Sequence, residues 1–249
     1  MTNKNKVKAG KLRTLWIIVM SALYTVNTCS RAAVRGLFGR ITREWCDQSF
    51  TRYVKKILKL VGVKYEIFNP HNVQPLPGQR TIVMCNHSSL YDIPLSGVAW
   101  PSHTLRMLSK KELSRIPIMG QGMVAAEFPF IDRHNRQQAQ KDLDYVKELL
   151  VSGVLMWIAP EGTRSKNGKL AAFKKGGFIT AIQTGAVIIP MGIRGANNIL
   201  PARTRQFNLN EHVEIHIGDP IDASKFTLAN KEELIDLVHQ EMKTLVGEA

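Results

Sequence analysis

The segment Thr81–Asp92, with the sequence T-I-V-M-C-N-H-S-S-L-Y-D, decides how the chain around it folds. Its first five residues are largely apolar and partly β-branched, which is typical of a short buried strand. Residues 86–89 are turn formers, and the sequence from Leu90 onward is compatible with the start of a helix. The segment therefore predicts a strand, a turn and a helix in immediate succession.

This turn brings a histidine and a carboxylate within reach of each other. His87 and Asp92 would lie about 140° apart on a continuous helix and on opposite faces of a continuous strand, so only a bend lets them meet. A carboxylate on one ring nitrogen fixes the tautomer of an imidazole, and the other nitrogen can then take a proton from a substrate hydroxyl. We expect His87 to be a general base and Asp92 its orienting group, with an external hydroxyl as the nucleophile.

Two other interpretations stay open at this point. Ser89-x-x-Asp92 fits a helix capping box, in which Asp92 does nothing more than cap a helix. Cys85, two residues before His87, is either the nucleophile of a cysteine–histidine pair or a small buried strand residue. Its place in the predicted strand favours the buried residue.

Composition narrows the class of protein. The chain has 249 residues, of which 44% are hydrophobic, and its three cysteines have no metal-ligand spacing, so we expect neither a metal site nor a disulfide framework. The formal net charge of +14 indicates an anionic partner. Because no nucleic-acid-binding motif or basic stripe interleaved with aromatics is found, a phospholipid surface or a phosphorylated substrate is favoured over nucleic acid.

The N-terminal region predicts a membrane anchor. The apolar run Leu15–Cys29 is flanked on both sides by basic residues and is shorter than the roughly 20 residues that a spanning helix needs. A secretory signal peptide is the alternative, but no A-x-A cleavage site follows. From Arg31 to Val63 apolar residues recur at helical spacing among basic ones, which fits either an interfacial helix or a core helix with a solvated basic side. We expect residues 1–62 to form two membrane-anchoring helices that enter one leaflet.

Residues 63–249 predict a single α/β domain. Strands are expected over residues 64–68, 81–85, 105–108, 127–133, 153–160, 186–191 and 213–217, and helices over 91–98, 136–151, 178–184 and 232–246. Strands that alternate with helices indicate a mostly parallel or mixed sheet flanked by helices. Residues 120–125 also fit a loose dinucleotide fingerprint, but the strand and helix that should flank it are missing.

A second chemical cluster follows the strand that ends near Pro160. In an α/β sheet, ligands bind where loops leave the carboxyl ends of strands. Gly162 lets a ligand approach the backbone, Thr163 offers a hydroxyl and Arg164 a guanidinium suited to a phosphate. Lys110 and Arg133 end other predicted strands and add cationic groups. An ordinary tight turn is the alternative for residues 161–164; a Walker loop is excluded by spacing, and no G-x-S-x-G elbow occurs.

With these residues in place, the chain resembles the bacterial 1-acyl-sn-glycerol-3-phosphate acyltransferases within the wider glycerolipid acyltransferase family. Four ordered blocks carry the resemblance: N-H-x-x-x-x-D at Asn86–Asp92, F-I-D-R at Phe130–Arg133, P-E-G-T-R-S at Pro160–Ser165, and V-I-I-P at Val187–Pro190. Two residues depart from the family pattern: Glu127 stands where Gly is frequent, and Ala159 stands where Phe precedes the proline.

The resemblance implies acyl transfer from acyl-CoA or acyl-carrier protein to the sn-2 hydroxyl of lysophosphatidic acid, giving phosphatidic acid with no further cofactor. It implies His87 as base and Asp92 as orienter. The implied phosphate-binding group is Arg133, Glu161, Gly162, Thr163 and Arg164, to which the residues themselves add Lys110. The expected location is the cytoplasmic face of the inner membrane. The alternatives are acyl transfer to glycerol 3-phosphate or another lysolipid, and a non-catalytic lipid-binding protein at the membrane surface.

Overall fold

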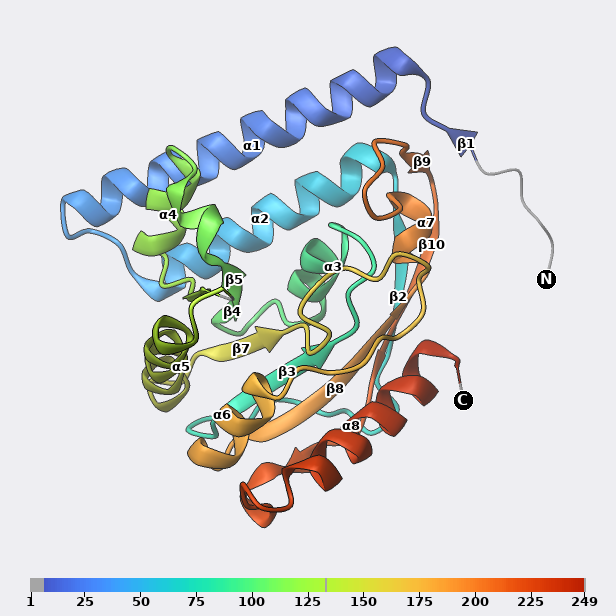
Figure 1. Ribbon diagram of the computed structural model, residues 1–249. Helices are drawn as coiled ribbons and strands as arrows, with labels where there is room; N and C mark the ends of the chain where they lie inside the picture. The colour runs from blue at the N-terminus through green and yellow to red at the C-terminus, as the bar shows by residue number, and fades with distance from the viewer. Residues whose placement is uncertain (1–6, 133, 249) are drawn as a thin grey trace.

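The computed structural model describes residues 7–132 and 134–248, and its centre is a seven-stranded mixed sheet (Figure 1). Strand β3 lies in the middle, parallel to β8 on one side and to β7 on the other, and β7 pairs in parallel with β4. Beyond β8 lies the antiparallel β10, which pairs in parallel with β2 at the edge. The strands are β2 (Lys64–Phe68), β3 (Thr81–Cys85), β4 (Leu105–Met107), β7 (Leu155–Ile158), β8 (Val187–Arg194), β10 (His212–Ile217) and β11 (Ile221–Asp222), which pairs with β8. The predicted α/β class is confirmed.

Helices cover both faces of this sheet, and β3 shows why. Alternate side chains of a strand point to opposite faces. Val83 and Cys85 join a buried cluster with α2 (Arg43–Val61) and α3 (Asp92–Ala99), whereas Ile82 and Met84 join one with α5 (Arg136–Val151), α6 (Gly176–Thr184) and α8 (Lys231–Val246). Because both faces are buried, the strand is an unbroken run with no exposed position.

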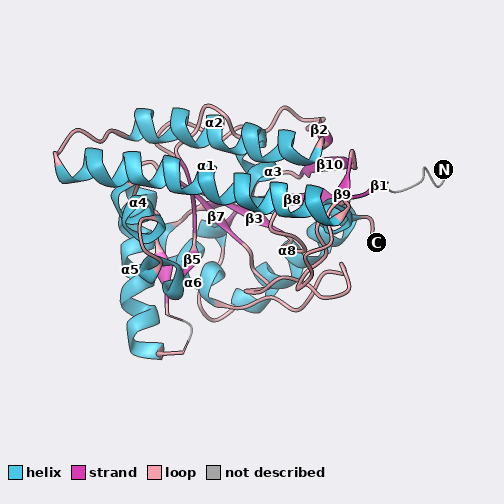
Figure 2. Cartoon of the chain, turned by 90° about the horizontal axis from the view of Figure 1, so that it is seen from above, coloured by secondary structure: helices cyan, strands magenta, loops and turns pink. Residues whose placement is uncertain are grey.

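Two long helices lie side by side over one face of the domain (Figures 1 and 2). The first, α1 (Lys11–Leu37), continues past the point where a second helix was expected to begin. The chain turns at Gly39, whose φ is +62°, and Thr42 then caps α2 by accepting a hydrogen bond from the Trp45 amide. Gly62, with left-handed backbone, ends α2.

Helix α2 is the core helix with a solvated basic side that the sequence left as one of two interpretations. Val54, Ile57, Leu58 and Val61 are buried in the same cluster as the central strands, and its lysines face outward. The functional boundary expected between residues 62 and 63 therefore stays a prediction, because no break in packing accompanies it.

Helix α1 presents most of its apolar side chains outward. It is the one helix among the described residues that is long and apolar enough to cross a membrane, judged by length and composition. Its inner side lies along α2: the Arg13 guanidinium donates to the Leu60 carbonyl at 2.7 Å, and the hydroxyls of Thr25 and Tyr53 lie 3.1 Å apart. Exposed apolar residues along its outer side are Leu12, Leu15, Trp16, Ile18, Val19, Leu23, Val26, Val34 and Leu37.

The glycines of the loose dinucleotide fingerprint serve helix packing instead. They lie in α4 (Met119–Ala125), which crosses α1 at close range. A β-carbon at Gly122 would collide with the backbone of Cys29, and one at Gly120 would collide with the Ser114 carbonyl. The residues therefore permit close packing of α4, and the element directly before α4 is a 3₁₀ helix over Lys111–Arg115 rather than the strand that a nucleotide-binding turn needs.

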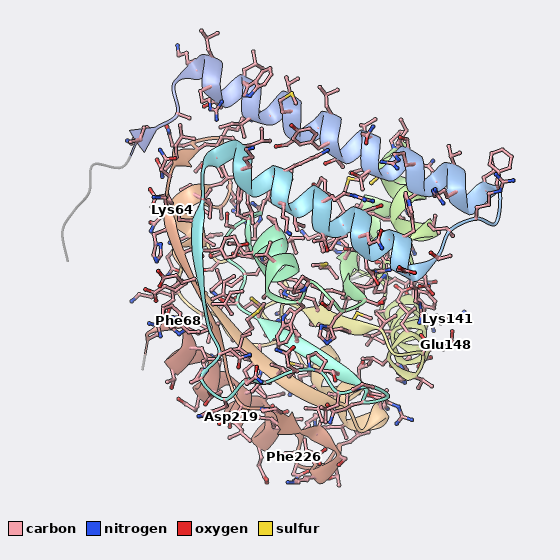
Figure 3. All side chains as sticks on the ribbon, turned by 180° about the vertical axis from the view of Figure 1, so that it is seen from behind. Lys64, Phe68, Lys141, Glu148, Asp219 and Phe226 are labelled. Atoms are coloured by element: carbon pink, nitrogen blue, oxygen red, sulfur yellow. The ribbon has the colours of Figure 1, made fainter. Side chains whose placement is uncertain are left out.

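Short elements complete the chain. Of the aromatic strand expected over residues 127–133, the described residues 127–132 form only β6 (Phe130–Ile131), because Glu127 has a φ of +60° and closes α4 rather than extending a strand. Strand β6 pairs in parallel with β5 (Ser109–Lys110), ahead of the 3₁₀ helix η1 (Lys111–Arg115). Strand β1 (Val7–Lys8) pairs with β9 (Asn208–Leu209). The remaining short elements are α7 (Ala196–Ile199) and η2 (Ala223–Lys225). Figure 3 shows β2 running from Lys64 to Phe68 along the outer edge of the sheet.

Candidate functional site

The histidine and the carboxylate that the sequence singled out do meet. The Nδ1 atom of His87 lies 2.8 Å from Oδ2 of Asp92, at the carboxyl end of β3 and the start of α3. The His87 side chain is 17% exposed and Asp92 is fully buried. Because the carboxylate accepts a hydrogen bond from Nδ1–H, Nε2 is the nitrogen with a lone pair to offer a substrate.

Asp92 both orients the histidine and braces the turn. Its Oδ2 atom also accepts hydrogen bonds from the amides of Ser88 and Ser89, at 2.7 and 2.8 Å. The helix itself starts at Asp92 without a side-chain cap. One carboxylate oxygen therefore accepts from three donors, so Asp92 contacts His87 as well as the turn and is more than a helix cap.

Two residues that the sequence analysis did not single out also fix the position of His87. The side-chain amide of Asn86 exchanges two hydrogen bonds with the backbone of Ile193, at 2.8 and 3.0 Å, and so joins the end of β3 to β8. The ring of Trp157 packs edge-on against the imidazole, with centroids 5.8 Å apart. Asn86 could have been suspected from its place beside His87, whereas Trp157 requires knowledge that β7 pairs with β3.

Glu161 connects the two predicted loops. Its Oε1 accepts the backbone N–H of His87 at 2.8 Å and its Oε2 that of Ala171 at 3.0 Å, and the side chain is buried. Burial raises the pKa of the Glu161 carboxyl, and these two hydrogen bonds oppose that rise. In return, the amide of Ser165 donates to the His87 carbonyl at 2.7 Å. The loop of residues 160–165 is therefore held directly against His87.

Two residues of the predicted phosphate group, Thr163 and Arg164, belong to the loop of residues 160–165. Arg164 is half-buried and Thr163 exposed, and neither side chain forms a hydrogen bond or ion pair within residues 7–132 and 134–248. Gly162, directly before them, has a φ of +74°, which lets the loop turn tightly at this point. Lys110 stands opposite Ile131 in the β5–β6 ladder, so pairing brings it to the F-I-D-R block. Arg133 lies outside the described residues.

Within that block, Asp132 organises its own turn. Its carboxylate accepts hydrogen bonds from the amides of His134 and Asn135 and pairs with the Lys111 ammonium at 3.2 Å. These hydrogen bonds, from the His134 amide first and then from Lys111, lower the pKa of the carboxyl. Of the two adjacent lysines, Lys111 is therefore engaged by the protein and Lys110 is exposed.

Cys85 is a buried strand residue. It is fully buried, and burial raises the pKa of its thiol well above the ordinary value, with the negative charge of Asp92 adding to the rise. A thiolate nucleophile next to His87 is therefore disfavoured. Among the described residues, no group of three or more histidine, cysteine or acidic side chains could hold a metal ion.

Glu127 has a backbone conformation that is uncommon for residues other than glycine. Its φ of +60° is the left-handed conformation that glycine adopts freely, which accounts for glycine at this place in the family pattern. The Glu127 carboxylate forms a two-pronged ion pair with Arg43 of α2, at 2.6 and 2.8 Å. This contact joins the end of α4 to the second N-terminal helix.

Comparison with known proteins places this arrangement in context. The family model described as "Acyltransferase" matches residues 64–194. A 1-acyl-sn-glycerol-3-phosphate acyltransferase of Haemophilus influenzae is 29% identical over 202 residues, which cover 79% of this chain and 80% of that protein. The crystal structure of the 1-acyl-sn-glycerophosphate acyltransferase PlsC from Thermotoga maritima superimposes with a TM-score of 0.78 at 26% identity, covering 95% and 94% of the two chains.

Some other relatives are longer. The chain spans 57% of a Caenorhabditis elegans relative that is 32% identical over 162 residues. It spans 50% of the chloroplastic 1-acyl-sn-glycerol-3-phosphate acyltransferase of Arabidopsis thaliana, at 29% identity over 182 residues.

Proposed function

Because the chain belongs to the acyltransferase family, we propose that it transfers a fatty acyl group from a thioester to the sn-2 hydroxyl of lysophosphatidic acid, giving phosphatidic acid. The thioester is acyl-CoA or acyl-carrier protein. The observation that carries this proposal is the His87–Asp92 pair, a base with its orienter, held against the Arg164 loop. The names of the relatives from Haemophilus and Thermotoga support the acceptor.

The chemistry follows from the pair. Nε2 of His87 takes the proton of the acceptor hydroxyl as its oxygen attacks the thioester carbonyl, and Asp92 stabilises the imidazolium that forms. The tetrahedral intermediate then breaks its carbon–sulfur bond, and the imidazolium returns the proton to the departing thiolate. The products are an ester and a thiol, and His87 is neutral again. No acyl-enzyme is needed, in keeping with the buried thiol of Cys85.

The phosphate end of the acceptor is assigned to the second loop. Arg164 offers a planar fork of N–H donors, and Thr163, Lys110 and Arg133 supply further donors. Glu161 belongs to this group as a positioning residue, because both of its oxygens accept backbone N–H groups and a carboxylate would repel a phosphate. It sets the spacing between the base and the loop that carries Arg164.

An apolar cavity that reaches the start of α3 offers room for a fatty chain. It encloses about 160 Å³ and reaches Ile93, the residue after Asp92, from the space between α1, α2 and α4. A cavity of roughly 150 Å³ lined by aliphatic and aromatic side chains is large enough to bind benzene, so this one can take part of an alkyl chain. Its aromatic wall is formed by Phe50 and Phe128.

The membrane is reached through α1. Its outward apolar face supports association with a bilayer, and we assign it to the cytoplasmic side of the inner membrane. We place α1 along the surface, entering one leaflet, because its inner side lies against α2 and the basic side of α2 would otherwise be drawn into hydrocarbon. Protease access to tags at both ends of α1 in sealed vesicles tests this: access from one side supports the in-plane anchor, and access from opposite sides contradicts it.

Acceptor choice tests the proposed reaction. Purified protein with an acyl thioester is offered lysophosphatidic acid, glycerol 3-phosphate or lysophosphatidylcholine, and the acylated products are separated and counted. We expect lysophosphatidic acid to be the preferred acceptor. Preference for glycerol 3-phosphate would show that the protein carries out the preceding acylation instead. Equal use of lysophosphatidylcholine would show that the Arg164 loop does not select a phosphate monoester.

A further inference from the structure

A cationic pocket lies between α1 and α2, next to the apolar cavity, with which it shares Thr28, Trp45, Ser49 and Tyr53. It has a volume of about 90 Å³ and none of its lining residues belongs to the loops that hold His87 or Arg164. Three cations, Arg31, Arg52 and Lys56, line it together with three aromatic rings, those of Tyr24, Trp45 and Tyr53. The two helices that form it lie side by side along their length (Figure 2).

The cations of this pocket are held in place by rings and hydroxyls rather than by carboxylates. The Lys56 ammonium lies 5.3 Å from the centre of the Tyr24 ring, and the Arg31 guanidinium 5.7 Å from that of Trp45. Arg52 donates to the Ser49 hydroxyl at 3.3 Å. Within the described part of the chain, none of the three forms an ion pair. Three neighbouring positive charges without an acidic partner repel one another, and an anion placed between them would relieve that repulsion.

The surroundings of the pocket identify the anion. The outer side of α1 is apolar, with Leu23, Val26 and Val34 exposed close in sequence to the pocket residues Tyr24 and Arg31. Tyrosine and tryptophan are enriched at the headgroup level of bilayers, where one end of the ring is apolar and the other wet. A free phosphate could contact the three positive charges but would make no apolar contact with α1. A phospholipid could contact the cations with its phosphate and the apolar side of α1 with its acyl chains.

We propose that this pocket is a specific binding site for the headgroup phosphate of one anionic phospholipid, whose acyl chains lie along the exposed face of α1. The site is an accessory one: it holds the enzyme at the anionic surface and neither binds nor transforms the reacting lipid. The proposal goes beyond a diffuse attraction of basic helices to a charged surface, because it assigns the effect to three of the many cations on α1 and α2.

The matched test removes the same charge from the same helix at two places. Arg52→Ala with Lys56→Ala empties the pocket of two cations, whereas Lys55→Ala with Lys59→Ala removes two exposed lysines of α2 that do not line it. Full-length protein in neutral detergent is titrated with phosphatidylglycerol, phosphatidylcholine or inorganic phosphate. Bound lipid is counted by native mass spectrometry, and no turnover is measured.

We expect wild-type protein to bind one phosphatidylglycerol saturably. The affinity of the Arg52→Ala, Lys56→Ala variant should be at least tenfold lower. The affinity of the Lys55→Ala, Lys59→Ala control should stay within twofold of wild type. Phosphatidylcholine should bind at least tenfold more weakly than phosphatidylglycerol, and millimolar phosphate should not displace the lipid. His87→Ala should bind phosphatidylglycerol as wild type does, whatever becomes of its activity.

Equally weakened phosphatidylglycerol binding in both double variants would overturn the proposed site, because it would show a general attraction of the basic helices to anionic lipid. Displacement by phosphate alone would show an anion site without a lipid partner. Loss of binding in His87→Ala would show that the lipid counted occupies the catalytic site instead.

Discussion

Replacing Asp92 by asparagine separates its two tasks. Oδ2 of Asp92 accepts from His87, Ser88 and Ser89 together. We expect the amide oxygen of asparagine to take the same place, because the opposite orientation would set its NH₂ group against two backbone N–H donors. The turn and the imidazole tautomer are then preserved, and only the negative charge is lost.

The size of the effect follows from that charge. At an effective dielectric constant of about 20, unit charges about 4 Å apart interact by about 4 kcal/mol. Since about 1.4 kcal/mol corresponds to a tenfold change in rate, kcat should fall by about 10³-fold. Stability should hold or rise, because Asp92 is fully buried and the cost of burying its charge disappears.

Acylation of lysophosphatidic acid on vesicles gives the rate, and thermal unfolding followed by circular dichroism gives the stability. A rate within about threefold of wild type would refute the reasoning, because asparagine caps a helix about as well as aspartate and a mere cap would survive the change. The variant that combines Asp92→Asn with His87→Ala should be no slower than His87→Ala alone. Independent, multiplicative losses would show that Asp92 acts on something other than His87.

Three further predictions concern residues around the pair. Arg164→Lys should raise the KM for lysophosphatidic acid by about tenfold or more and leave that for the thioester within twofold, since the planar fork is lost but the charge is kept; equal effects on both would make Arg164 a structural residue. Cys85→Ala should retain activity within about twofold of wild type and lose about 1 kcal/mol of stability. A variant that is folded but inactive would show that the Cys85 thiol takes part in the reaction. Hydrogen bonding from Arg43 lowers the pKa of Glu127, so Glu127→Gln should reduce the free energy of unfolding above pH 4.5, by about 1 kcal/mol at most. The difference between variant and wild type should vanish as the pH falls through the lowered pKa. A difference that grows in acid would contradict the ion pair.

Where a segment's own pattern determines its structure, the sequence predicted it well. The helix expected over residues 136–151 is α5 with the same bounds, and residues 81–85 are β3. Helix α5 has a clear helical periodicity that begins after the capping residue Asn135, and β3 is an unbroken, largely apolar run that ends at the turn formers of residues 86–89. The bend at residues 86–89 was likewise predictable, because only a bend makes use of His87 and Asp92 together.

Tertiary contacts determine the rest. The expected break near residue 30 is absent, since no breaker stands there and Gly39 supplies the turn. The strand over residues 127–133 shrinks because Glu127 adopts a positive φ, which its partner Arg43, 84 positions away, helps to hold. The role of Glu161 in clamping His87 to Ala171 depends on the pairing of β3 with β7, and sequence spacing carries no sign of it.

The central claim is that His87 activates the acceptor hydroxyl directly. Its most direct test follows thioester consumption and phosphatidic acid formation together, with lysophosphatidic acid as acceptor, for wild-type protein and for His87→Ala. We predict matched loss of thioester and gain of phosphatidic acid in the wild type, no acyl-enzyme, and a rate lower by about 10²–10⁴-fold in the variant, whose fold is unchanged. A His87→Ala protein that still turns over at the wild-type rate, or a wild type that consumes no thioester in the presence of this acceptor, would contradict the account.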